Sequence, residues 1–207
     1  MTSRKTPTVD AARHWVRDFY PYNRDHLLQS LVWLERIAPD APEAVRIATV
    51  THDMERAFPG PDQPISVRLN DPAYDAAHAE RSARIVGRWL REQNVPWDLI
   101  TDVAALIAAH EVGGWPDADL VQAADSLSFL DTNIGLFLGF ARSGRFPLGD
   151  VAAKFEHSYE RIRVDHAREL AKPLLYSARA QLSAFEREIL IHSGRSVEST
   201  DTFEETV

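Results

Sequence analysis

NRDHLLQSLVWLERIA (residues 23–38) is the stretch of sequence that decides the fold class. Asn23 is a favourable N-cap residue, and Pro39 follows directly after the stretch, where it would end a helix. Between them, apolar side chains recur at spacings of three and four, which places them on one face of a helix: Leu27, Leu28, Leu31, Leu34 and Ile37. The stretch therefore predicts an amphipathic α-helix.

Similar helical patterns lie on both sides of this stretch. The sequence predicts further helices over residues 9–20, 42–54, 72–93, 96–111, 117–142 and 148–191, the last range holding two helices separated near Pro173. Several prolines make residues 58–71 a loop, and a loop of this length in a compact domain is often functional. No alternating strand pattern interrupts the series, so we expect an all-α fold, a compact helical bundle.

A chain of 207 residues can bury a substantial core within one domain. We expect a single helical domain over residues 1–193, with a core at about 23–130 and C-terminal helices at about 148–193 packed on it. Residues 194–207 are polar and acidic, and we expect this tail to be disordered.

The composition narrows the kinds of site and partner. The chain has no cysteine, so any metal must be held by histidines and carboxylates. Its net charge of -8 disfavours nucleic acid polymers and anionic membranes as partners, although a metal ion could still attract a small anionic substrate. No apolar run is long enough for a secretion signal or a membrane span, so we expect a cytoplasmic protein. Formation of homo-oligomers stays open.

Metal-binding residue types lie mostly near the ends of five expected helices: His26, His52, Asp53, His78, His110 and Asp125. Taken alone, a helical histidine is more often a core or surface residue than a ligand. A bundle that gathers helix ends around one cavity could bring all six together. Six groups are too many for one catalytic ion that keeps open positions, whereas two ions sharing them could polarise a phosphoryl oxygen and supply a nucleophile.

The order of a His, a His-Asp pair and a later Asp resembles the HD superfamily of metal-dependent phosphohydrolases. The matching text is NRDHLLQSLVWLERIA, AVRIATVTHDMERAF and DADLVQAADSLSFL. This resemblance covers about residues 23–130 and implies that the first metal is bound by His26, His52, Asp53 and Asp125. AYDAAHAERSARIVGRWL and LIAAHEVGG are similar to the two-metal branch, which implies a second site completed by His78 and His110, with Asp53 bridging the ions.

The resemblance implies hydrolysis of a phosphoester or phosphoanhydride bond in a small phosphorylated substrate, with nucleotides among the candidates. The cofactor would be two divalent transition metal ions, drawn from Fe, Mn, Co, Ni and Zn. Two alternatives stay open. One is a di-iron oxygenase of the same superfamily, which would cleave a C–C or C–P bond with O2 through the same ligands. The other is a non-catalytic module that binds a nucleotide.

Phosphoryl transfer needs cations that neutralise the non-bridging oxygens. The candidates for substrate binding are Arg56, Arg81, Lys154 and Arg161, and those for catalysis are Asp53, Arg56 and Glu111. Lys154 and Arg161 share one helix face with His157, but that face could equally be solvated, with local pairing to glutamates. Glu111 could act on a water molecule, or it could instead cap the helix end or hold a neighbouring ligand in place.

Overall fold

The computed structural model describes residues 6–198, with side chains described for residues 6–191. Every regular element in this part of the chain is helical, so the predicted all-α class is confirmed. The elements are α1 (Pro7–Phe19), α2 (Arg24–Ile37), α3 (Glu43–Thr51), η1 (Met54–Ala57), α4 (Pro72–Glu92), α5 (Trp97–Ala109), α6 (Pro116–Thr132), α7 (Ile134–Arg142), α8 (Leu148–Glu160) and α9 (Asp165–Glu198).

Prolines mark the starts of many of these helices. Pro7, Pro72 and Pro116 are the first residues of α1, α4 and α6, where the missing N–H would have no partner within the helix in any case. Side-chain caps complete two of these starts. Thr6 Oγ1 accepts from the Val9 N–H, and Asp71 Oδ1 accepts from the Ala73 N–H.

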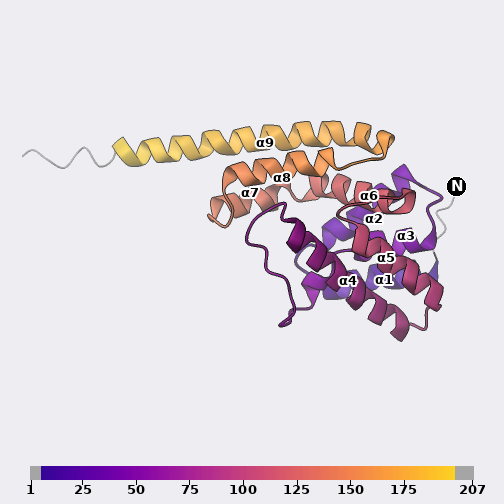
Figure 1. Ribbon diagram of the computed structural model, residues 1–207. Helices are drawn as coiled ribbons and strands as arrows, with labels where there is room; N and C mark the ends of the chain where they lie inside the picture. Colours follow the sequence, from indigo (N-terminus) through magenta and orange to yellow (C-terminus); the bar gives the residue numbers. More distant parts are fainter. Residues whose placement is uncertain (1–5, 199–207) are drawn as a thin grey trace, which may run out of the picture.

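The core lies where α2 packs along α6 and α3 packs against α1, α2, α5 and α6, while α4 lies along α5 (Figure 1). Four apolar residues predicted on one face of α2 are buried there: Leu27, Leu31, Leu34 and Ile37. The helices α7, α8 and α9 lie on one side of this bundle, and α9 runs along α8 and past it (Figure 1). This arrangement brings the ends of α2, α3, α4 and α5 around the middle of α6.

Two predicted helix boundaries were wrong because packing outweighs local preference. Pro173 lies inside α9, and the break falls earlier, between α8 and α9. A proline inside a helix costs about 3 kcal/mol, but the face of α9 on either side of Pro173 is buried: Ala167, Ala171, Leu175 and Ala178. The stretch predicted as one helix over 117–142 is two helices, since α6 ends at Thr132 and α7 begins at Ile134.

The helix α9 extends into the range where we expected a C-terminal tail. We predicted a disordered tail from residue 194, but α9 continues to Glu198, and residues 199–207 lie outside the described residues. Within residues 6–198, no helix combines the length and the apolar character needed to cross a bilayer.

Candidate metal centre

The structure brings the six candidate metal ligands together inside the bundle. His26 lies in the first turn of α2, His78 in the second turn of α4, and Asp125 in the middle of α6. His52 and Asp53 directly follow α3, and His110 directly follows α5. All six side chains are buried.

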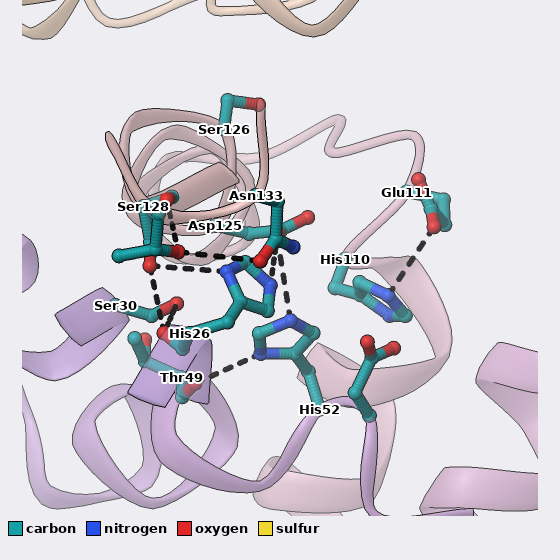
Figure 2. Close-up of polar contacts among 12 residues, drawn as sticks. His26, Ser30, Thr49, His52, His110, Glu111, Asp125, Ser126, Ser128 and Asn133 are labelled. Atoms are coloured by element: carbon teal, nitrogen blue, oxygen red, sulfur yellow. Dashed lines mark hydrogen bonds and ion pairs between the residues drawn. The ribbon is translucent and has the colours of Figure 1, made fainter. Parts of the chain in front are cut away.

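Asp125 and two histidines form the first group of ligand atoms. His26 Nε2 lies 3.1 Å from Asp125 Oδ1, and His52 Nε2 lies 3.4 Å from the same oxygen. In Figure 2 both imidazoles point toward Asp125. The three ligand atoms lie within 4.8 Å of one another, close enough to hold one metal ion.

Two further groups extend the cluster toward α4 and α5. His52, Asp53 and His110 form one, and His78, His110 and Glu111 form the other, each with ligand atoms within 4.8 Å of one another. His52 and His110 each belong to two groups. The buried cluster is therefore continuous and could hold metal at more than one position.

Hydrogen bonds on the outer nitrogens fix the orientation of three imidazoles. The distances are 3.0 Å from His26 Nδ1 to Ser128 Oγ, 2.8 Å from His52 Nδ1 to the Thr49 carbonyl oxygen, and 2.7 Å from His110 Nδ1 to the Ile107 carbonyl oxygen. Both carbonyls lie in the last turn of their helices, where a carbonyl oxygen can accept from a side chain, and the Ile107 oxygen also accepts from the His110 N–H at 3.3 Å. An Nδ1–H that donates to a carbonyl leaves Nε2 as the free lone pair, which is the arrangement of metal-ligating histidines.

Three inward-facing nitrogens have no hydrogen-bond partner among the described residues: His52 Nε2, His78 Nδ1 and His110 Nε2. A buried polar atom without a partner costs about 1–3 kcal/mol, so native proteins seldom leave three of them close together. A metal ion would satisfy these lone pairs. The donor set thus fits the divalent transition metals expected from the sequence.

The carboxylates of the cluster are ionised. Burial alone would raise the pKa of Asp53, but Arg56 and the neighbouring histidines lower it well below its usual range. Arg161 outweighs burial in the same way and lowers the pKa of both Asp125 and Glu111. Burial disfavours a charged His52, but the nearby Asp125 raises its pKa to about 9, so His52 carries a proton at neutral pH that a bound metal ion would displace. The three carboxylates are therefore available as charged ligands for a metal cation.

Glu111 lies within reach of the cluster. Its Oε1 is 3.0 Å from His78 Nε2 and 3.6 Å from His110 Nε2, so it can orient these ligands or act as a further donor. The turn after it requires glycine, because Gly113 has a φ of +63° and a Cβ there would lie 2.2 Å from Asp119 Oδ1. The turn brings the chain into α6, whose Gln122 donates to the Glu111 carbonyl.

Arg161 joins two parts of the site that are far apart in the sequence. It follows α8, and its buried guanidinium contacts the carboxylates of both Asp125 and Glu111, with Nε 2.8 Å from Ser126 Oγ. The break between α8 and α9 allows the side chain to turn into the bundle. The sequence left two interpretations of the helix face that carries Lys154 and Arg161, a substrate-binding face and a solvated one. Arg161 is buried, so its side chain is not part of a solvated face.

The other predicted cations occupy different places. Arg56 Nη1 lies 2.8 Å from Asp53 Oδ2, and both Arg56 and Lys154 border the cavity over the site. Arg81 does not border that cavity. Its guanidinium binds Glu55 and Asp62 at 3.0 and 3.1 Å and donates to the Phe58 carbonyl at 2.7 Å. This placement ties the proline-rich loop to α4.

A cavity of about 710 Å³ opens beside the cluster. His26, Asp53 and Asp125 border it together with Glu111, whereas the other three histidines are buried beneath its surface. The sequence interpretation missed its aromatic side, formed by Phe129, Phe137, Phe140 and Phe146, and the stacking of Tyr74 on His78. Phe129 could have been found, since it follows Asp125 by four residues and so shares its helix face.

Comparison of the chain with family models, curated proteins and solved structures gives no match. Its function is therefore inferred from the side chains and the cavity described above.

Proposed function

We propose that this chain is a metal-dependent phosphohydrolase of the HD type, acting on a small phosphorylated substrate. One observation carries the proposal. Three buried histidine nitrogens without hydrogen-bond partners face a cluster of ionised carboxylates, next to a cavity whose lining includes Arg56, Lys154 and Arg161. Sites that hold metal ions beside several cations are suited to phosphoryl groups, which carry negative charge on several oxygens.

Each side chain has a role that follows from its position. One ion would be held by His26, His52, Asp53 and Asp125, and a second by Asp53, His78 and His110, with Glu111 as a further donor. When bound, two ions would polarise a phosphoryl oxygen and activate water at neutral pH. Arg56 and Lys154 neutralise the non-bridging oxygens. Glu111 is ionised, and its Oε1, 3.0 Å from His78 Nε2, would hold that ligand in place.

The direct test is metal analysis of protein purified without chelator, followed by a phosphate-release screen with Mn²⁺, Co²⁺, Ni²⁺ or Fe²⁺. We expect two ions per chain and release of inorganic phosphate from at least one class of phosphate ester or anhydride. Two irons with O2 consumption and no phosphate release would instead identify the oxygenase. Bound metal without either reaction would identify a binding module.

Lys154 offers a test of substrate binding. It stands 5.9 Å from the Phe129 ring centroid and makes no ion pair among the described residues, so its charge is available to a ligand. Lys154→Gln should raise KM roughly tenfold to a hundredfold, since a hydrogen bond to a charged group contributes about 1.5–3 kcal/mol. Steady-state phosphate release measures this.

The matched control is Lys172→Gln, which removes an exposed lysine of α9 that pairs with Glu169. Its KM should stay within about twofold of the unchanged chain, because exposed pairs contribute little. Equal KM values for the two variants would contradict the role of Lys154.

A further inference from the structure

The cavity is larger than a phosphoryl group needs. A volume of about 710 Å³ falls within the range of sites that enclose a whole small molecule. Asp53, Asp125 and Arg161, which together with a metal ion could hold the phosphoryl group, line one part of the cavity. The rest of the volume must accommodate whatever carries the phosphate.

A row of four phenylalanines forms one wall of the remaining volume: Phe129, Phe137, Phe140 and Phe146. Successive ring centroids are 4.9, 5.3 and 5.9 Å apart, with interplanar angles of 74°, 67° and 77°. These are edge-to-face contacts, which hold aromatic rings in fixed positions. The row begins one helical turn after Asp125, so it leads from the metal centre along α6 to α7 and the turn after it.

The proline-rich loop also lines the cavity. Its apolar residues Pro61, Pro64, Ile65 and Leu69 border the cavity, and so do its polar residues Gln63, Ser66, Arg68 and Asn70. Ile65 is 82% exposed although it borders the cavity, so an apolar ligand would remove it from water. Figure 1 shows this loop on the side of the bundle where α7 lies. The loop side of the lining is therefore mixed, and the continuous apolar part of the lining is the phenylalanine row.

Few groups on the wall formed by the phenylalanine row can form hydrogen bonds. The described lining residues between Ile134 and Phe146 are Leu136, Phe137, Phe140, Arg145 and Phe146. The Arg145 guanidinium lies over the rings of Phe140 and Phe146, at 4.6 and 5.2 Å from their centroids. A nucleobase needs hydrogen bonds for its polar edge, and leaving them unmade is costly. A hydrocarbon needs none.

We propose that the substrate is a phosphate ester of an apolar alcohol, with its phosphoryl group at the metal centre and its hydrocarbon on the phenylalanine row. This inference rests on the proposed phosphohydrolase function. The P–O bond to the alcohol breaks, the oxygen of water forms the new bond to phosphorus, and the departing alcohol takes a proton. The products are inorganic phosphate and an apolar alcohol, and no oxidant or reductant is needed.

The test measures binding apart from turnover. Ethyl-, butyl- and hexylphosphonate carry a P–C bond that hydrolysis does not break, and they are titrated calorimetrically into the metal-loaded full chain without oxygen. A fully buried methylene contributes about fourfold in affinity, so hexylphosphonate should bind at least about tenfold more tightly than ethylphosphonate. Affinity independent of chain length would overturn the inference.

A variant locates the effect. Phe140→Ala should weaken hexylphosphonate at least about fivefold and leave ethylphosphonate within about twofold, since the short chain does not reach that ring. Tyr176→Ala is the control, because Tyr176 is 76% exposed on α9 and does not border the cavity. Equal losses for both phosphonates, or for both variants, would contradict the position assigned to the hydrocarbon.

Turnover separates this inference from the proposed function. Faster phosphate release from hexyl or naphthyl phosphate than from glycerol phosphate and adenosine monophosphate supports both. Phosphate release that favours the polar esters overturns the apolar substrate and leaves the hydrolase intact. A third outcome is phosphonate binding that depends on chain length, with no phosphate release from any ester. It would overturn the hydrolase and support only binding of hydrocarbon on the phenylalanine row.

Discussion

Asp53→Asn is expected to remove most of the bound metal and to reduce phosphate release by at least about 1000-fold, because both ions of the proposed centre depend on this carboxylate. Asp53 Oδ1 lies 3.6 Å from His78 Nδ1, and its pKa is held low, so it is charged at neutral pH. Asparagine keeps the size of the side chain and loses that charge. Metal content per chain and phosphate release measure the two effects.

The control for this variant is Asp62→Asn. Asp62 is an exposed carboxylate of the proline-rich loop that pairs with Arg81 and Arg84. The metal content of the Asp62→Asn protein should match that of the unchanged chain. Full metal content and full activity in Asp53→Asn would exclude Asp53 as a bridging ligand and with it the two-ion arrangement.

Arg161→Leu should destabilise the protein more than any surface substitution. The change leaves the buried carboxylates of Asp125 and Glu111 without their cation, and breaking a buried ion pair typically costs about 3–5 kcal/mol. For a chain of this size we expect Tm to fall by roughly 10 °C. Thermal unfolding followed by circular dichroism in a chelating buffer measures the loss.

The metal changes the size of this effect. Bound cations would neutralise the same two carboxylates, so the fall in Tm should be smaller when the protein is saturated with metal. Arg179→Leu removes an exposed pair with Glu156 and should cost less than about 1 kcal/mol in either buffer. An Arg161→Leu loss that is equal with and without metal would place the metal away from Asp125 and Glu111.

The helices, and the positions of several candidate ligands near helix ends, could be predicted because both depend on residues that are close together in the sequence. Apolar spacing predicted α2, and its residues Leu27 and Leu34 are fully buried. His26 and His110 were predicted near helix ends, and the structure has them there. A bundle that gathers helix ends around one cavity could bring these side chains together, and the full set of ligands was what the resemblance to the HD superfamily implied.

The features that the sequence did not predict, or predicted wrongly, depend on contacts between segments that are distant in the sequence. Arg161 and Asp125 are 36 residues apart, and only the break before α9 turns the arginine inward. Arg81 was predicted to bind substrate because it lies one helical turn from His78, yet it faces Glu55 and the loop. Pro173 would end a helix on local preference alone, but a buried face carries α9 past it.

The position of Arg161 gives the C-terminal helices an energetic connection to the centre of the bundle. The two carboxylates that Arg161 contacts are also candidate metal ligands. Arg161 and a metal ion would therefore both interact with the negative charge of Asp125 and Glu111. A force or a partner that pulls α8 away from α6 would change the free energy of metal binding. By thermodynamic reciprocity, metal binding would change the free energy of packing α8 against α6 by the same amount.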